Sequence, residues 1–281
     1  MANENINTKA ELAMKKYELA KHEKRPTMHE YIPRIFENFI ELHGDRGYSD
    51  DKAILCGLAK FNGLPVTVIG HLRGRNTKEN IETNFGMALP EGYRKALRQM
   101  KQADKFNRPI ITFVDTKGAY PGPEAEERGQ GEAIAKNLIE MSRLRVPVIT
   151  VITGQGNSGG ALGIAQANCV LMLENATYAI ISAKGFMSIL WRDSESRKDP
   201  EKEKEAAMRL KMTAADLLKF GVIDGIIPEP PEGAHKDHDL TAAAIKAAVA
   251  VHLEPLLKMT PEEIYTHRYN KFRNMGFFNE I

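Results

Sequence analysis

Two glycine-rich segments carry most of the residues whose types and spacing could do chemistry. The segment "GQGNSGG" covers residues 154–160, and "DTKGAYPG" covers residues 115–122. Each follows an apolar, β-branched run that predicts a buried strand. Ligand sites of parallel sheets gather at the carboxyl ends of such strands. A ligand site is therefore expected at this edge, where backbone donors from two different loops could converge on one oxygen.

The first segment also matches a dinucleotide-binding pattern. Gly154, Gly156 and Gly159 fit G-x-G-x-x-G, and Glu174 comes twenty residues after Gly154, where the pattern expects a ribose-binding acid. A dinucleotide fold usually places this loop after its first strand, whereas several predicted strands come earlier here. Three interpretations stay open at this point: tight packing of a helix on a strand, NAD binding, and an oxyanion hole.

The backbone of this segment favours an anion. Gly159 and Gly160 fall at the predicted start of a helix, where the first N–H groups have no acceptor within the helix. Glycine has no Cβ atom, so a ligand oxygen can approach its backbone closely. Such a site suits a phosphate or an oxyanion that forms during a reaction.

Composition limits the classes of protein that fit. The chain has 281 residues, 42% of them hydrophobic and 27% charged, with a formal net charge of +2. This composition is typical of a soluble globular protein. The small net charge gives no overall electrostatic attraction for nucleic acid. Cys56 and Cys169 lie far apart, without a C-x-x-C pair, so we expect buried thiols and no metal site in this chain. No signal peptide or membrane-spanning run is expected, which predicts a cytoplasmic protein.

Hydrophobic periodicity predicts an α/β fold with a largely parallel sheet, because apolar strands alternate with helices. Residues 27–42 are expected to form one amphipathic helix, with Thr27 and Glu30 as a capping box. A second helix is expected over residues 93–106. Its cations Arg94, Lys95 and Arg98 could bind the phosphates of CoA or the partner subunit, and the interpretation given slightly more weight is a solvated helix face.

Several long motifs, in order, resemble a known family. They include "GLAKFNGLPVTVIGH", "NFGMALPEGYRKALRQM", "PIITFVDTKGAYPG", "GQGNSGGALGI" and "SILW". From roughly Tyr17 to the C-terminus the chain resembles the α subunits of bacterial acetyl-CoA carboxylase carboxyltransferases. The resemblance implies a crotonase-like spiral of ββα units. It predicts an N-terminal helical extension over residues 1–43, the carboxyltransferase domain over 44–260 and a C-terminal helical tail over 261–281.

The resemblance also implies an activity and its partners. With a β subunit of the same fold, such a chain moves a carboxyl group from carboxybiotin to acetyl-CoA, giving malonyl-CoA for fatty acid synthesis. Biotin reaches the site on a biotin carboxyl carrier protein after loading by biotin carboxylase. Activity is expected only with the β subunit, in an assembly of two α and two β chains. Zinc is expected in the β partner, and neither a membrane nor a nucleic acid is required.

The matched motifs assign roles to individual residues. The resemblance implies that the backbone amides of Gly159 and Gly160 form an oxyanion hole. The match to the dinucleotide pattern would then be coincidental, and Glu174 would be an ordinary acidic residue at the end of a strand. The expected walls of the biotin pocket are Gly118, Ala119, Tyr120 and Gly156. Basic residues of the segment "GHLRGRNTKEN" could bind the phosphates of CoA or the partner subunit, or belong to a solvated, ion-paired loop; they are Arg73, Arg75 and Lys78.

Two lysines depart from the usual motifs of the family. Lys117 stands where the first loop usually has proline, and Lys184 stands in "SAKG" where the family has S-P-E-G. Other functions that remain open are a crotonase-fold acyl-CoA hydratase or isomerase, an NAD-binding subunit, and a non-catalytic scaffold for the β subunit. A hydratase or isomerase normally needs a carboxylate near the thioester, and neither glycine loop presents one.

Overall fold

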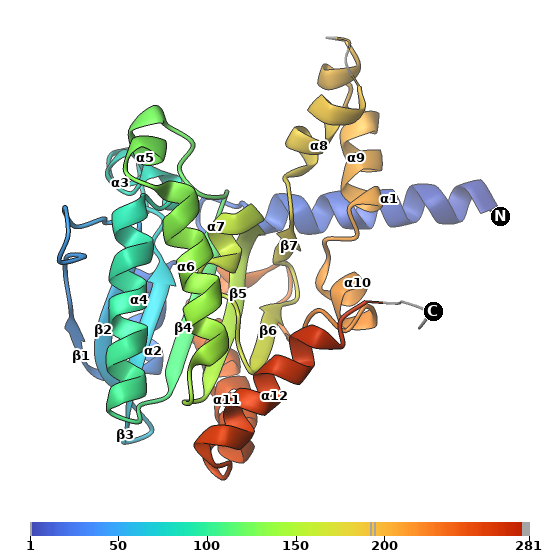
Figure 1. Cartoon of the computed structure of the whole chain (residues 1–281). Helices are drawn as coiled ribbons and strands as arrows, with labels where there is room; N and C mark the ends of the chain where they lie inside the picture. Colours follow the sequence, from blue (N-terminus) through green and yellow to red (C-terminus); the bar gives the residue numbers. More distant parts are fainter. Residues whose placement is uncertain (1, 192, 194, 277–281) are drawn as a thin grey trace, which may run out of the picture.

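An eight-stranded sheet forms the centre of the computed structural model, which describes residues 2–191, 193 and 195–276 (Figure 1). The strands are β1 (Glu37–Glu41), β2 (Ile54–Phe61), β3 (Leu64–His71), β4 (Ile110–Thr116), β5 (Val148–Asn157), β6 (Cys169–Leu173), β7 (Thr177–Ala179) and β8 (Gly225–Ile227). Their order is β1-β2-β3-β4-β5-β6-β8, and β7 pairs with the end of β5. The first three strands are antiparallel and the pairs from β3 onward are parallel. The predicted α/β fold with a largely parallel sheet is confirmed.

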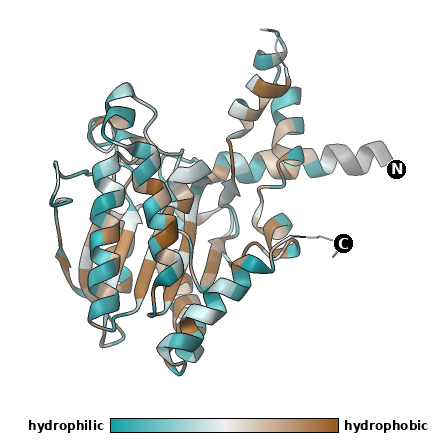
Figure 2. Cartoon of the chain, viewed as in Figure 1, coloured by the Kyte–Doolittle hydropathy of each residue, from teal (hydrophilic) through white to brown (hydrophobic). Residues whose placement is uncertain are grey.

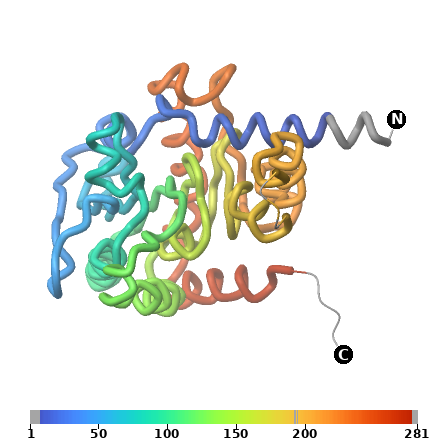
Figure 3. The backbone as a smooth tube through the Cα atoms, turned by 90° about the horizontal axis from the view of Figure 1, so that it is seen from above, coloured from blue at the N-terminus to red at the C-terminus, as the bar shows by residue number. Residues whose placement is uncertain are grey.

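Helices cover both faces of this sheet (Figures 1 and 3). The α-helices are α1 (Ala2–Ala20), α2 (Met28–Ile35), α3 (Thr77–Glu82), α4 (Pro90–Lys105), α5 (Pro123–Glu127), α6 (Gln130–Arg143), α7 (Ser158–Leu162), α8 (Ala183–Leu190), α9 (Pro200–Arg209), α10 (Ala214–Lys219), α11 (His238–Leu257) and α12 (Pro261–Arg273). Short 3-10 turns occur at η1 (Asn84–Gly86), η2 (Ser196–Lys198) and η3 (Ala234–Lys236). In Figure 1, α4 and α6 lie side by side in front of the sheet, and α2 and α11 lie behind it.

The main core lies where the strands meet these helices. Every residue of β4, β5 and β6 is buried, which explains why their sequences are almost continuously apolar rather than alternating. Figure 2 shows hydrophobic residues concentrated in the strands and polar residues on the outer helix faces. Both cysteines lie in this core as free thiols.

The prediction of one helix over residues 27–42 is correct only for its first half. The Thr27–Glu30 capping box is present, but α2 ends at Ile35, Phe36 is extended, and β1 follows. β1 pairs with β2, and the Phe39 ring fills the space above Gly57, where a Cβ atom would lie 2.4 Å from Phe39 Cε2. Pairing with a distant strand therefore outweighs the local helical pattern.

An arm of three helices projects from the body (Figure 1). α1 packs along α9, and α9 packs against α8. A second apolar cluster holds the arm together and includes Ala13 and Tyr17 of α1, Met187 of α8 and Ala206 of α9. At the other end of the chain, Ile264 of α12 belongs to the main core. The predicted domain divisions at residues 43 and 260 stay predictions, and residues 1 and 277–281 of those segments lie outside the described residues.

α11 is a long, apolar helix of 20 residues. By length and composition alone, α11 could cross a membrane, although no such run was predicted. Its residues Ile245, Val249 and Leu253 are buried in the main core, and the helix packs against α2, β5 and β8. In this structure these buried apolar side chains therefore serve to cover the sheet.

Candidate functional site

The two glycine segments meet at the carboxyl ends of β4 and β5. Thr116 of β4 pairs with Gly156 of β5, after an irregularity in register that follows Val114. Beyond the strand, the Thr116 Oγ1 atom accepts a hydrogen bond from Gly118 N–H at 3.0 Å and donates one to Gly118 O at 2.7 Å. Gly118 has a φ of +140°, a conformation that side chains rarely adopt. The strand end thus fixes the path of the loop that follows it.

A shared acceptor fixes the far side of this loop. The Ala88 carbonyl accepts hydrogen bonds from Tyr120 N–H at 3.0 Å and from Gln130 Nε2 at 2.8 Å. Gln130 Nε2 also donates to the Tyr120 carbonyl at 3.0 Å. Since Gln130 is buried, the loop around Gly118, Ala119 and Tyr120 is held between β4 and α6.

Gly160 brings the second segment against the first. A Cβ atom on Gly160 would lie 2.3 Å from Ala119 N and 2.3 Å from the Gly118 carbonyl carbon, so no side chain fits there. The same atom on Gly159 would meet only Ile134, at 3.7 Å. Within the described part of the chain, the N–H groups of Gly159 and Gly160 have no hydrogen-bond acceptor. The structure therefore brings together Gly118, Ala119, Gly159 and Gly160, and leaves backbone donors free beside them.

The turn from β5 into α7 has a strained backbone and is held by hydrogen bonds from buried side chains. Ser158 has a φ of +60°, a conformation that is uncommon for residues other than glycine and that recurs at functional sites. The buried Tyr93 hydroxyl donates to the Gly160 carbonyl at 3.2 Å. Asn137 Nδ2 donates to the Gly163 carbonyl at 2.9 Å and to the Tyr93 carbonyl at 3.1 Å. These buried polar groups hold the start of α7 in place.

The glycines of the dinucleotide pattern have other structural causes. Gly154 and Gly156 lie inside β5 rather than in a loop after it. A Cβ atom on Gly154 would lie 2.3 Å from Asp115 Oδ1, and one on Gly156 would lie 2.9 Å from Tyr178 Cδ2. Glu174 forms an ion pair with Lys16 at 2.8 Å. Because a dinucleotide needs these glycines in a loop before a helix, the geometry does not support NAD binding.

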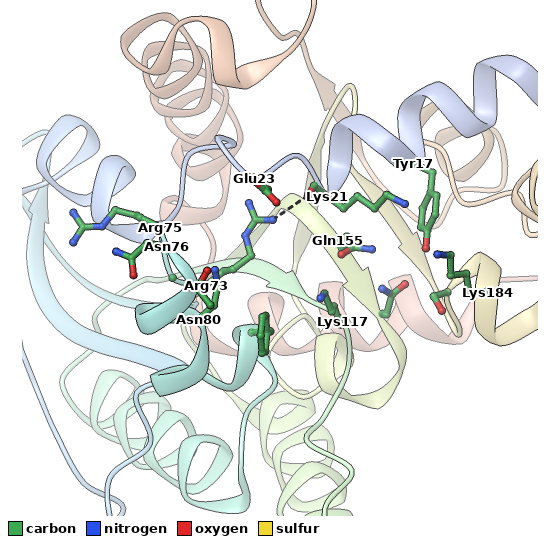
Figure 4. A pocket seen from close by; sticks show the side chains of 15 residues that line it. Tyr17, Lys21, Glu23, Arg73, Arg75, Asn76, Asn80, Lys117, Gln155 and Lys184 are labelled. Carbon is green, nitrogen blue, oxygen red and sulfur yellow. Dashed lines mark hydrogen bonds between the residues drawn. The ribbon is translucent and has the colours of Figure 1, made fainter.

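A cavity of about 550 Å³ opens next to the glycine loops (Figure 4). It is lined by Tyr17, Lys21, Glu23, Arg73, Gly74, Arg75, Asn76, Thr77, Asn80, Phe85, Lys117, Gln155, Asn157, Ser182 and Lys184. Of the residues expected to bind CoA, Arg73 and Arg75 line it, whereas Lys78 of α3 is exposed outside it. The residues expected in the biotin pocket and oxyanion hole are not among its lining. The structure therefore separates the glycine contact from the basic residues.

Both arginines of the cavity already have partners. Arg73 lies 3.5 Å from Asp115 and donates to the carbonyls of His22 at 3.2 Å and Lys21 at 3.5 Å. Arg75 is held by Glu79 at 3.0 Å. Arg73 thus joins the loop after α1 to the end of β3, and Arg75 stabilises the start of α3.

Two polar residues from the end of β5 line the cavity although the sequence did not predict them there. Gln155 and Asn157 are 5% and 3% exposed. Both are polar residues at alternating positions where an apolar strand ends, and that pattern could have indicated a ligand-facing edge. Tyr17 and Lys21 of the N-terminal segment line the same cavity, which no local pattern could indicate.

The cations of α4 differ from the expected solvated face. Lys95 is 1% exposed, and its Nζ donates to Asp50 Oδ1 at 2.6 Å and to the Asp51 carbonyl at 2.7 Å. Arg94 pairs with Asp45 at 2.8 Å, and Arg98 donates to the Gly44 carbonyl at 2.9 Å. The prediction was wrong because these side chains tie down the loop that precedes β2.

Neither thiol is placed for chemistry. Burial raises the pKa of Cys56 to about 12 and that of Cys169 to about 12, so both remain protonated at neutral pH. Among the described residues, no group of three or more His, Cys, Asp or Glu side chains could hold a metal ion.

Solved structures with similar folds include a transcarboxylase, acyl-CoA carboxylases and malonate decarboxylases. Transcarboxylase 12S, solved with methylmalonyl-coenzyme A and methylmalonic acid bound, matches with a TM-score of 0.69 and 22% identity. The match covers 85% of this chain and 43% of that one, so this chain spans less than half of that protein. A Pseudomonas malonate decarboxylase hetero-tetramer in complex with coenzyme A matches with a TM-score of 0.61 and 16% identity, over 80% and 88% of the chains. At these identities the likeness shows the fold, and it confirms the predicted crotonase-like architecture.

Sequence relatives are much closer. The acetyl-coenzyme A carboxylase carboxyl transferase subunit alpha of Staphylococcus aureus strain JH9 is 56% identical over 263 residues, covering 94% of this chain and 82% of the relative. The subunit from strain Newman gives the same values. The family model described as acetyl co-enzyme A carboxylase carboxyltransferase-like matches residues 3–276. With the glycine loops, the fold and these matches in agreement, the chain belongs to the acetyl-CoA carboxylase carboxyltransferase family, among its α subunits.

Proposed function

We propose that this chain, together with a β subunit, transfers a carboxyl group from carboxybiotin on a biotin carboxyl carrier protein to acetyl-CoA. The product is malonyl-CoA, which feeds fatty acid synthesis. The family and the carboxyltransferase class support this reaction. The single structural observation that carries it is the contact between Gly160 and the Gly118–Ala119 peptide, which places free backbone donors where two loops meet.

The chain's own part in the reaction is to stabilise negative charge. Carboxybiotin, when bound, supplies the carboxyl group and a ureido oxygen on which charge develops. The N–H groups of Gly159 and Gly160 would donate to that oxygen, and such preorganised donors stabilise charge strongly in a site that excludes water. Gly118, Ala119 and Tyr120 would form the opposite wall, and Gly156 would keep the base of the pocket free of side chains. No acidic or basic side chain of this chain is needed as the proton acceptor, because the biotin anion can serve.

Binding of acyl-CoA would involve the basic segment before and within α3. Arg73 and Arg75 precede α3 and line the cavity beside the glycine loops, whereas Lys78 lies on α3 and outside the cavity lining. These cations could attract the phosphates of CoA or contact the β subunit. The working assembly would contain two α and two β chains, with zinc in the β chain, and would act in the cytoplasm with biotin carboxylase and the carrier protein.

The reverse reaction tests this proposal directly. The chain is mixed with the carboxyltransferase β subunit of the same organism, and malonyl-CoA-dependent carboxylation of biocytin is measured. We expect activity only when both chains are present. Gly160→Val should abolish activity while the complex still assembles by gel filtration, because the new side chain displaces the Gly118–Ala119 peptide.

Gly131→Ala is the matched control. A Cβ atom on Gly131 would meet nothing within 4 Å, so this variant should keep full activity. Activity of the chain alone would refute the requirement for a β subunit. A Gly160→Val complex with normal activity would instead identify the chain as a scaffold.

A further inference from the structure

The cavity beside the glycine loops has an unbalanced charge. Among its described lining residues, five are cationic and only Glu23 is acidic; the cations are Lys21, Arg73, Arg75, Lys117 and Lys184. They come from the turn after α1, the segment after β3, the loop after β4 and the start of α8. Figure 4 shows Gln155 between Lys117 and Lys184 in the lining of the cavity. Segments far apart in the sequence thus converge on one cationic cavity.

Two of these cations lack a counter-ion. Arg73 and Arg75 are engaged with Asp115 and Glu79. Lys117 lies 4.9 Å from the centre of the Phe85 ring, and within the described residues neither Lys117 nor Lys184 forms an ion pair. Like charges facing one space repel each other, and a bound anion would remove that repulsion.

The end of β5 adds uncharged donors to the same cavity. Asn157 is 3% exposed, and its Nδ2 has no acceptor in the described part of the chain. A buried N–H donor without a partner is costly, which makes such groups rare in folded proteins. Asn157 and Gln155 both line the cavity. A ligand with several acceptor oxygens would satisfy these amides and the lysines together.

The backbone beside Lys117 is held in an unusual conformation. Asn84 and Phe85 of η1 have φ values of +47° and +56°. A positive φ is unfavourable for a bulky aromatic residue and persists only where the surroundings enforce it. Here it accompanies a cation–π contact in which the Lys117 ammonium lies over the Phe85 ring, and both residues line the cavity.

From these observations we infer that the cavity is a binding site for a phosphate group, held by Lys117, Lys184 and Asn157. A phosphate monoester carries about two negative charges and three acceptor oxygens at neutral pH, which matches two free lysines and an amide donor. A carboxylate carries one charge and would leave one lysine unpaired. The volume of about 550 Å³ admits a phosphorylated molecule larger than the phosphate itself. The phosphate could belong to CoA or to a separate phosphorylated compound.

Titration calorimetry of the purified full chain with inorganic pyrophosphate, in a magnesium-free buffer without phosphate, tests this site without any carboxyl transfer. We expect saturable binding that weakens as salt is raised, since the contact is ionic. Lys117→Met, Lys184→Met and Asn157→Asp should each weaken binding about tenfold or more. Lys60→Met is the matched control, because Lys60 is an exposed lysine on β2 outside the cavity lining. Thermal melts confirm that each variant is folded.

A second titration separates the two sources of phosphate. If the group belongs to CoA, CoA competes with pyrophosphate; if it belongs to another ligand, pyrophosphate still binds to the α–β complex at saturating CoA. Both results support the site. Absence of pyrophosphate binding would overturn it, as would equal weakening by Lys60→Met or binding of acetate as tight as that of pyrophosphate.

Discussion

Gly160 lies so close to Gly118 that the two backbones touch. A Cβ atom on residue 160 would lie 2.3 Å from the Gly118 carbonyl carbon and 2.8 Å from its oxygen. Neither neighbour is a flexible side chain that could move aside. The contact therefore depends on a missing side chain at residue 160, and it fixes how the loops after β4 and β5 lie relative to each other.

Substituting the two adjacent glycines should have very different effects on stability. Gly160→Ala must push the Gly118–Ala119 peptide away, and such overpacking lowers the free energy of unfolding by roughly 1–3 kcal/mol. Gly159→Ala gains only ordinary contacts with Ile134 at 3.7 Å and should change it by less than about 1 kcal/mol. Urea unfolding of both variants provides the measurement. Equal stabilities would show that the loop moves freely and that the contact is not fixed.

Tyr93 should act as a positioning residue for Gly160. Tyr93→Phe removes the hydroxyl that donates to the Gly160 carbonyl, so the start of α7 becomes less constrained. In the assembled complex we expect kcat for biocytin carboxylation to fall about tenfold while KM for malonyl-CoA stays unchanged.

Tyr31→Phe is the control for this effect. The Tyr31 hydroxyl is equally buried but has no hydrogen-bond partner among the described residues. Its removal should leave kcat unchanged and leave the free energy of unfolding equal or slightly higher. A similar loss of kcat in both variants would argue against a specific role for the Tyr93 hydroxyl.

Local patterns were sufficient to predict the framework of the site. The glycine segments follow apolar runs, and those runs are the buried strands β4 and β5. The capping box at Thr27 and Glu30 was also readable from the sequence, because both partners lie within four residues. Such features depend on neighbours along the chain, and a single sequence carries that information.

Features that depend on distant partners could not be predicted in this way. Residues 37–41 form a strand because β2 offers an edge to pair with. Lys95 is buried because the loop with Asp50 and Asp51 folds over it. The cationic cavity gathers Tyr17 and Lys184, which are separated by most of the chain. Strand pairing, burial of charge and convergence of loops are tertiary properties, and the local period does not encode them.

His71 should make stability depend on pH. Burial lowers the pKa of this histidine to about 3, although the backbone of Gly160 and Phe113 beside the ring opposes the shift. Below about pH 6.5 the unfolded chain binds a proton at this residue and the folded chain does not. The free energy of unfolding therefore falls as pH drops from about 6.5 to about 3, by up to about 1.4 kcal/mol per pH unit.

Comparison with a variant isolates the contribution of His71. In His71→Phe, the slope of stability against pH between pH 4.5 and 6.5 should be smaller than in the parent chain, as measured by urea unfolding. His29→Gln alters an exposed histidine and should leave the slope unchanged. If the parent and His71→Phe gave parallel curves, His71 would have to titrate normally in the folded state.

The ion pair between Arg25 and Glu229 should be essential for folding of the N-terminal segment onto the sheet. Both side chains are fully buried with 2.5 Å between Arg25 Nη2 and Glu229 Oε1, and Arg25 Nε donates to the Thr153 carbonyl. Burial alone would raise the pKa of Glu229, but Arg25 and Asn175 hold it below its usual value. Glu229→Gln leaves the guanidinium buried without a counter-ion and should lower the free energy of unfolding by roughly 3–5 kcal/mol.

An exposed pair provides the matched control. The side chains of Lys258 and Glu254 are 72% and 71% exposed in their ion pair, so Glu254→Gln should lower the free energy of unfolding by less than about 1 kcal/mol.

The stability difference between the parent and Glu229→Gln should also shrink as the pH falls through the pKa of Glu229, because protonation of Glu229 removes the same charge. Urea unfolding at pH 7.5 and pH 3 measures both effects, because the folded-state pKa of Glu229 lies below the ordinary value of 4.5. If Glu229→Gln were as mild as Glu254→Gln, water or a neighbouring group would have to compensate Arg25, and the attachment of the N-terminal segment would depend on apolar packing instead.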